Sequence, residues 1–332
     1  MQRLLQILSL KRAHLSEGEA EMIEAQIMPY NPDVFYDELG SVLGYVIEVG
    51  EGSETLFCAH TDTVHSSKEG KVNPVLFDEG LLLAYKEDGQ PLGADDGAGV
   101  WLMLEMIDAE VPGVYLFPRG EEKGGIGSSG IAELYPDFLE RFKYAIAFDR
   151  RGTKSVITYQ SRGKCCSNEF AQALADMLNP GGLELAPDST GIYTDTAEFV
   201  DLIPECTNIS VGYDYEHSGK EMLDVEFLIK LRDALIERFD ETQLPVVRKA
   251  GDLGEYHAMG WGSFGSRYRD YAVKGPRDER DIECMGFKEL VDWVESADPY
   301  DVADLLQSMS DKLYEARQGQ YYDDSRLSVG LM

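Results

Sequence analysis

The sequence predicts an α/β fold, a three-layer sandwich with helices on both faces of a mostly parallel or mixed central sheet, plus a small, mainly helical C-terminal unit. Strand-like and helix-like segments alternate from about residue 43 to residue 239, as in sheets covered by helices. Residues 55–59 (Thr-Leu-Phe-Cys-Ala) form an almost unbroken apolar run, which is typical of a buried strand. Beyond residue 239 the only clear periodicity is helical.

The elements of this fold can be placed from their periodicity and end signals. Residues 1–30 favour two helices with a break near His14, where Ser16 and Glu19 form a capping-box pattern. Strands are predicted at 43–49, 55–59, 114–117, 144–148, 155–159 and 207–211, and a hairpin at 74–85. Helices are predicted at 97–109, 128–135, 168–178 and 225–239.

The predicted domains are residues 1–240, a large α/β domain, and residues 245–332, an accessory C-terminal segment. Residues 240–245 are interpreted as a linker, and 251–276 are rich in Gly and Tyr. Amphipathic helices are expected at 286–295 and 300–317. They could cover the core, bind a partner or build a homo-oligomer, and the sequence does not choose among these.

Composition excludes several classes of function. The net charge of −31 argues against nucleic-acid binding, because phosphates favour a basic surface. No apolar run is long enough to span a membrane, and no secretory cleavage pattern is visible. Five cysteines form neither a disulfide framework nor a zinc-thiolate spacing. We therefore expect a cytoplasmic protein that binds neither nucleic acid nor membranes.

The segment Gly125-x-Gly127-x-x-Gly130 has the glycine spacing of a dinucleotide site, and it lies between a predicted strand and a predicted helix. Two adjacent carboxylates, Glu121 and Glu122, directly precede it, where a pyrophosphate would be repelled. The glycines have a second explanation, because they would allow a tight turn from the carboxylates into the helix. We favour this second reading, in which the loop presents carboxylates to a metal.

Histidines and carboxylates also stand at the ends of the other predicted strands or at the start of a helix. In sheets of this class the carboxyl ends of the strands form the ligand-binding edge. The side chains concerned are His60, Asp62, Asp95, Asp96, Glu121, Glu122, Asp149 and His217. Mixed imidazole and carboxylate sets suit zinc, manganese or cobalt, particularly as pairs that share a carboxylate. A dinucleotide site would leave most of these residues without a role.

These motifs resemble the di-zinc exopeptidase superfamily, which includes bacterial leucyl aminopeptidases, peptidase T and acylamino-acid deacylases. The resemblance covers roughly residues 35–240 and rests on five motifs in the family's order: His60-x-Asp62, Gly93-Ala-Asp95-Asp96-Gly, Glu121-Glu122-x-Gly, Asp149 and His217-x-x-x-Glu221. It implies two divalent metal ions, zinc with cobalt or manganese as alternatives. The short spacing between Asp149 and His217 resembles the compact aminopeptidase-type branch.

The resemblance also implies roles for individual residues. His60, Asp95 and Asp149 would hold one metal, and Asp95, Glu122 and His217 the other, with Asp95 bridging. Glu121 would be the general base acting with a metal-bridging hydroxide, and Asp62 would orient His60. A cis peptide bond between Asp95 and Asp96 is implied too. Independently, a carboxylate that is not a ligand is needed to move the proton of the attacking water.

The expected activity is hydrolysis of an amide or peptide bond by an exopeptidase, most simply an aminopeptidase. The expected substrate is a peptide or an N-acyl amino acid. Asp195 or Glu198 could receive a substrate's free amine, and Arg150 a substrate carboxylate. An acylamino-acid deacylase is one alternative, and a scaffold protein that retains the fold without catalysis is another. His65 is expected at the surface.

Overall fold

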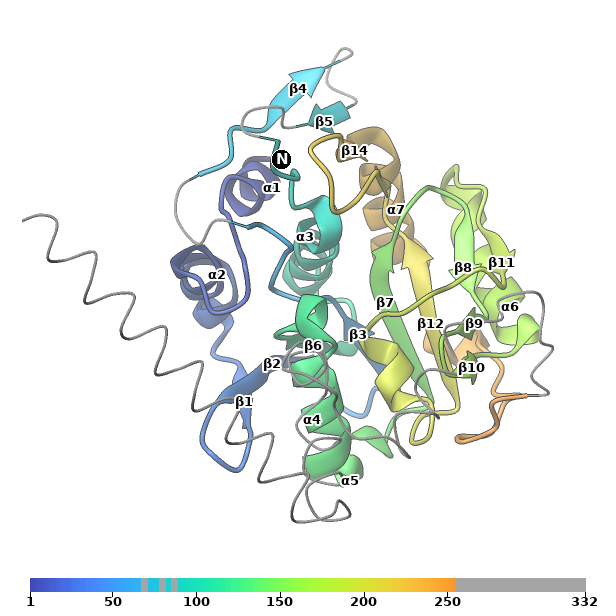
Figure 1. Ribbon diagram of the computed structural model, residues 1–332. Coiled ribbons are helices and arrows are strands. Elements are labelled where there is room, and N and C mark those ends of the chain that lie inside the picture. Colours follow the sequence, from blue (N-terminus) through green and yellow to red (C-terminus); the bar gives the residue numbers. More distant parts are fainter. Residues whose placement is uncertain (67–70, 78–81, 85–88, 255–332) are drawn as a thin grey trace, which may run out of the picture. The chain divides into compact units, whose positions relative to one another are not determined.

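The computed structural model describes residues 1–66, 71–77, 82–84 and 89–254, and the fold it shows is α/β. An eight-stranded mixed sheet lies between two layers of helices (Figure 1), which confirms the predicted class. Its strands are β1 (Asp33–Tyr36), β2 (Val42–Val49), β3 (Thr55–Cys58), β6 (Gly113–Pro118), β7 (Tyr144–Arg150), β8 (Ser155–Ile157), β11 (Ala186–Asp188) and β12 (Glu205–Ser210).

The strand order in the sheet is β1-β2-β6-β3-β7-β12-β8-β11. The four central strands β6, β3, β7 and β12 run parallel to one another. The pairs β1–β2, β2–β6 and β12–β8 are antiparallel, whereas β8 and β11 are parallel. Because β3, β6 and β7 are adjacent and parallel, the residues that follow them emerge at one edge of the sheet.

Successive side chains of the central strands point to opposite faces of the sheet and pack into two separate hydrophobic cores. In β3, Phe57 packs into one core, while Leu56 and Cys58 pack into the other. The first core is covered by α1 (Gln2–Leu8), α3 (Ala94–Asp108), α6 (Asn168–Leu178) and α7 (Val225–Arg238). The second is covered by α4 (Ile126–Leu134) and α5 (Pro136–Leu139). This two-sided burial is the reason that the strand sequences are almost continuously apolar.

Helix starts follow the expected capping chemistry. The Ser16 hydroxyl accepts a hydrogen bond from Glu19 N at 3.1 Å, at the start of α2 (Glu17–Met22). The Glu19 carboxylate, however, accepts from Leu15 N and not from Ser16 N, so only half of the predicted capping box forms. Helix α2 continues into the short helical segments η1 (Ile23–Ile27) and η2 (Met28–Tyr30). Ser167 and Asp224 cap α6 and α7 in the same way.

Smaller elements complete the described part. The predicted hairpin corresponds to β4 (Val75–Phe77) and β5 (Leu82–Ala84), which join β13 (Tyr213–Asp214) and β14 (Met222–Asp224) in a four-stranded antiparallel sheet. Strands β9 (Tyr159–Gln160) and β10 (Gly163–Lys164) pair with each other. The short 3-10 segments are η4 (Glu121–Lys123), η5 (Asn179–Gly181), η6 (Asp195–Phe199) and η7 (Glu241–Gln243). Sequence reasoning missed β1 and β11, which lie at the two edges of the large sheet.

After α7 the chain packs back against the core, in the last described residues before position 255. Arg248 is almost fully buried and donates hydrogen bonds to the carbonyl oxygens of Val200, Ile203 and Pro204. Glu205 accepts hydrogen bonds from the backbone N–H groups of Val247 and Arg248. The helices expected at 286–295 and 300–317 lie outside the described residues, so the accessory segment remains a prediction. Among the described helices, none is long and apolar enough to cross a membrane.

Candidate metal centre

The sequence-predicted ligands come from five different segments and meet at the carboxyl edge of the parallel strands. His60 follows β3, Asp95 lies in the first turn of α3, and Asp149 lies in β7. Glu122 lies in η4, and His217 lies in the loop that joins β13 to β14. The peptide bond between Asp95 and Asp96 is cis, as the resemblance implied.

Three triads of side chains present ligand atoms within 4.8 Å of one another: two of them share Asp95, and the third consists of His60, Glu121 and Glu122. In the first, His60 Nε2 lies 3.2 Å from Asp95 Oδ1 and 3.6 Å from Asp149 Oδ1. In the second, His217 Nε2 lies 3.0 Å from Asp95 Oδ2 and 3.1 Å from Glu122 Oε1. The two oxygens of Asp95 therefore face two different histidines, which is the arrangement of a bridging carboxylate.

The side chains of the neighbouring residues Glu121 and Glu122 point in different directions. Glu122 Oε1 approaches His217, whereas Glu121 Oε2 lies 3.9 Å from His60 Nε2. Both side chains line a cavity of about 310 Å³, together with Asp95, Asp149 and His217. Glu121 thus faces the same space as the two triads that share Asp95 and belongs to neither of them, although it forms the third triad with His60 and Glu122.

Burial and mutual hydrogen bonding perturb the acid–base properties of this cluster. Burial raises the pKa of Glu121 well above its ordinary value. The nearby carboxylates of Asp95 and Glu122 raise the pKa of His217 to about 11. Burial opposes a charge on the His60 ring, but the surrounding carboxylates outweigh it and raise its pKa. Such mutual stabilisation shows that the cluster carries strong negative potential, which suits a cation.

Asp62 contacts the second ring nitrogen of His60, as expected, and also the loop of Glu121. The His60 ring atom Nδ1 lies 3.0 Å from the backbone carbonyl of Asp62 and 3.6 Å from its carboxylate. The carboxylate atom Oδ1 also accepts hydrogen bonds from Gly120 N at 2.9 Å and Glu121 N at 3.1 Å. Asp62 therefore holds His60 through its main chain and the loop of Glu121 through its side chain.

The glycines of the fingerprint allow backbone segments to approach closely. A Cβ at Gly127 would lie 2.2 Å from Leu43 O and 2.6 Å from Arg119 O. Gly127 N donates to Arg119 O at 2.8 Å, and this bond ties the start of α4 to the residues before Glu121. Gly125 has a φ of +69°, a left-handed conformation that favours glycine. The glycines thus serve the turn itself, as the metal interpretation expected.

Sequence reasoning missed residues that orient the ligands. The Tyr213 hydroxyl lies 2.9 Å from Asp149 Oδ1 and donates to it, and Asn208 exchanges hydrogen bonds with the backbone of Asp149. Glu221 accepts from Gly93 N and Asp95 N, both at 2.9 Å. Glu221 stood in a quoted motif, whereas nothing in the sequence marked Tyr213 or Asn208, which reach Asp149 only through the fold.

The three predicted substrate contacts have different positions. Arg150 lines the cavity, and its Nε is buried with no hydrogen-bond partner. Asp195 and Glu198 do not line it. Asp195 is 1% exposed, and burial raises its pKa to about 7. Glu198 accepts a hydrogen bond from Tyr193. The roles of these residues in substrate binding remain proposals.

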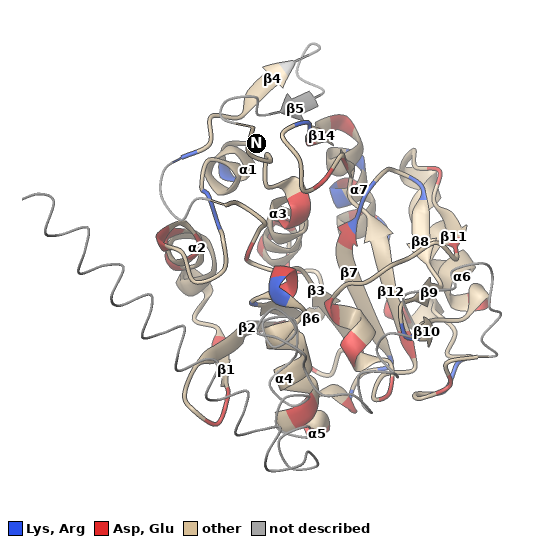
Figure 2. Ribbon diagram, in the orientation of Figure 1, with Lys and Arg blue, Asp and Glu red and all other residues tan. Residues whose placement is uncertain are grey.

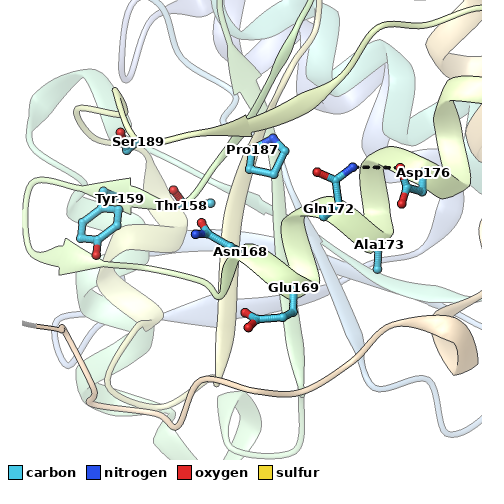
Figure 3. Close-up of a pocket in the computed structure, with 9 residues that line it drawn as sticks. All are labelled: Thr158, Tyr159, Asn168, Glu169, Gln172, Ala173, Asp176, Pro187 and Ser189. Carbon is cyan, nitrogen blue, oxygen red and sulfur yellow. Dashed lines mark hydrogen bonds between the residues drawn. The ribbon is translucent and has the colours of Figure 1, made fainter.

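Two other features bear on the sequence-based expectations. His65 is buried, with Nδ1 2.5 Å from Thr63 Oγ1 and Nε2 3.1 Å from Pro91 O, so the expected surface position is wrong. A second cavity, of about 770 Å³, lies beside α6 and β11 (Figure 3). None of the predicted ligands lines it, so it is not part of the metal centre.

Residues 46–221, more than half of the chain, match the sequence model of peptidase family M28. The chain belongs to peptidase family M28. This result confirms the superfamily that the five motifs resembled, and it makes the chain a member of a metallopeptidase family. No curated protein sequence matches the chain.

Solved structures support the fold of this M28 chain. The aminopeptidase PepT from Bacillus cereus aligns with a TM-score of 0.58 at 14% identity, over 71% of this chain and 95% of that one. A tripeptidase from Staphylococcus aureus aligns with a TM-score of 0.59 at 15% identity, over 71% and 95%. The TET1 peptidase of Pyrococcus horikoshii aligns with a TM-score of 0.51 at 20% identity, over 72% and 99%. At such identities the likeness concerns the fold alone.

Proposed function

We propose that this M28 family member is a metal-dependent aminopeptidase that removes one residue from a short peptide. The observation that carries the proposal is the pair of triads sharing Asp95, with Glu121 beside them and facing one cavity. Two metal ions held in this way would polarise the scissile carbonyl and acidify water. We propose zinc as the ion, with cobalt or manganese as alternatives.

The residues fit such ions on two counts. The donor atoms are imidazole nitrogens and carboxylate oxygens, the set that zinc prefers when no thiolate is present. In addition, His60 Nε2 and Glu122 Oε1 are buried without a well-formed hydrogen bond, although other ligand atoms lie within 3.2 Å of each. Buried polar atoms are normally satisfied, so these two point to a partner of a different kind.

Glu121 is the proposed proton carrier. It lines the cavity, its side chain is largely buried, and its raised pKa makes its carboxylate a stronger base than a solvated one. In this position it would take a proton from the attacking water and deliver it to the leaving nitrogen. Asp62 fixes the backbone of Glu121 during both transfers, because its Oδ1 accepts from Glu121 N.

An acidic cavity supports recognition of a free amino terminus. Acidic groups of the cavity include Glu121, Glu122 and Glu216, and the basic Arg151 is paired with Glu216 at 3.2 Å. Figure 2 shows acidic residues on helices and loops throughout the described part, so the surrounding field also attracts cations. Glu216 Oε2 is buried without a hydrogen-bond partner, and we propose that it can receive the amine in place of the more deeply buried Asp195 or of Glu198.

One observation favours the alternative of an acylamino-acid deacylase. Arg150 lines the same cavity, and its Nε has no hydrogen-bond partner. Its Nη2 donates to Thr190, and Asp188 lies 3.8 Å away, so its charge is only partly compensated. A carboxylate next to the scissile amide, as in an N-acyl amino acid, would form a charge-assisted hydrogen bond with the Arg150 guanidinium.

A single peptide supplied free, N-acetylated and C-amidated separates the two activities, with zinc, cobalt and manganese each tested. The aminopeptidase proposal expects N-acetylation to abolish cleavage and C-amidation to be tolerated. The opposite pattern would establish the deacylase and make Arg150→Gln strongly defective, with Arg162→Gln, outside the cavity lining, as the matched control. Absence of turnover with every metal, together with no bound metal after reconstitution, would leave the scaffold alternative.

A further inference from the structure

The N-terminal segment of the chain contributes a buried charge to the back of the metal centre. Glu19 lies in α2, ahead of residues 46–221 that match the family, and it is completely buried. A carboxylate is rarely buried without a partner, because removing its charge from water is costly. What Glu19 contacts therefore indicates why it is there.

Each oxygen of Glu19 accepts two hydrogen bonds. Oε1 accepts from Arg119 Nε at 3.0 Å and from Thr61 Oγ1 at 2.7 Å. Oε2 accepts from Arg119 Nη2 at 2.6 Å and from Leu15 N at 2.7 Å. The contact with Arg119 is thus a two-point, charge-assisted pair, which fixes direction as well as distance.

Two of the partners of Glu19, Thr61 and Arg119, lie in different segments that carry site residues. Thr61 lies between His60 and Asp62, at the end of β3. Arg119 lies between β6 and Glu121, and its backbone bonds Leu43 O and Gly127 N at 3.0 and 2.8 Å. Glu19 therefore contacts both the segment that carries His60 and the segment that carries Glu121 and Glu122.

We propose that Glu19 is a positioning residue that fixes the loop of Glu121 and Glu122 relative to His60, so that the N-terminal segment is an integral part of the metal centre. The inference rests on the proposed metal-dependent function. It does not make Glu19 a ligand, since its oxygens are already fully engaged. Its effect passes through Thr61 and Arg119 to side chains that must meet within a few ångströms.

The consequence for function follows from geometry. Glu121 Oε2 and His60 Nε2 are 3.9 Å apart and are carried by the two segments that Glu19 joins. Displacement of a reacting group by about 1 Å can reduce turnover by about 10²-fold. Loss of a residue that orients metal ligands typically reduces metal affinity by about 10–100-fold.

The test substitutes Glu19→Gln, which keeps the shape but places an amide where Arg119 or Leu15 needs an acceptor. The matched control is Glu17→Gln, an exposed glutamate in the first turn of the same helix. For the full-length apoproteins we measure zinc affinity by calorimetry, then kcat and KM with the free peptide. We expect Glu19→Gln to weaken zinc binding about 10–100-fold and lower kcat with little change in KM, while Glu17→Gln matches the wild type.

A double-substitution cycle separates positioning from general damage to the fold. If Glu19 acts through Arg119, the double variant Glu19→Gln/Arg119→Gln should bind zinc no more weakly than the worse single variant. Should Glu19→Gln fail to fold, Arg119→Lys keeps the charge but loses the two-point contact, and the same loss of affinity is expected of it. Folded variants with wild-type zinc affinity and kcat would overturn the proposal. A wild-type protein that binds none of zinc, cobalt and manganese would instead overturn the proposed function.

Discussion

Replacement of Gly127 by alanine should damage the metal centre, although the change adds a single methyl group far from any ligand atom. The new Cβ would meet Leu43 O at 2.2 Å, Arg119 O at 2.6 Å and Arg119 N at 2.7 Å. All three are backbone atoms, and Leu43 and Arg119 are hydrogen-bonded to each other at 3.0 Å. Neither can move away without disturbing the β2–β6 ladder or the turn that carries Glu121.

The magnitude follows from overpacking. Inserting a methylene into a well-packed interior costs about 1–3 kcal/mol, and clashes with backbone belong at the upper end. Alanine recovers at most about 1 kcal/mol through its higher helix propensity. We therefore expect Gly127→Ala to lose about 2–3 kcal/mol, a fall in Tm of roughly 4–12 °C for a domain of this size. Turnover should fall about 10²-fold if Glu121 moves by about 1 Å.

Gly130 provides the control within the same fingerprint. A Cβ there would meet Leu43 Cδ2 at 2.7 Å and Cδ1 at 3.0 Å, which are the methyl ends of one side chain and not backbone atoms. Gly130→Ala gains the same helix propensity and should change stability by less than about 1 kcal/mol. Equilibrium denaturant unfolding and peptide turnover are measured for both variants. Equal stability and equal kcat for the two variants would show that the close approach at Gly127 does not hold the loop.

Three further substitutions test individual roles. Glu121→Gln should leave zinc binding almost intact in calorimetry while lowering kcat by about 10²–10⁴-fold, because only proton transfer is lost. Asp95→Asn should lose affinity for both ions, since one shared ligand is weakened; retention of two tightly bound ions would contradict the bridging role. Tyr213→Phe removes the hydrogen bond to Asp149 and should weaken zinc binding by about 10–100-fold without unfolding the protein. Unchanged affinity in Tyr213→Phe would mean that Asn208 alone suffices to orient Asp149.

Several site residues could be predicted because their signals are local. His60, Asp95, Glu121, Glu122 and Asp149 each follow a strand pattern or start a helix, and the carboxyl ends of parallel strands meet at one edge. The residue types then restrict the chemistry to hard and borderline cations. His217 was found in the same way, because it follows the strand predicted at 207–211 after a short loop.

Other features could not be predicted, because contacts between distant segments of the chain determine them. His65 stands in a polar segment that predicts a surface position, yet its ring is buried and contacts Thr63 and the carbonyl oxygen of Pro91. The Asp62 carboxylate makes further contacts that the sequence did not indicate, because its Oδ1 accepts from the backbone N–H groups of Gly120 and Glu121. Edge strand β11 contains Pro187, which removes one backbone donor and hides the strand from pattern reasoning.

The sequence by itself determined the alternation of strands and helices in the central part of the chain, the two-sided burial of the sheet and the identity of the candidate metal ligands. These features depend on the periodicity and the chemistry of residues that are close together in the sequence. Only the tertiary structure decided which atoms support those ligands: Glu19 with Arg119, 100 positions apart, and Tyr213 with Asp149, 64 apart. Such pairs carry no sequence period, because their geometry arises only when the separate segments pack against one another.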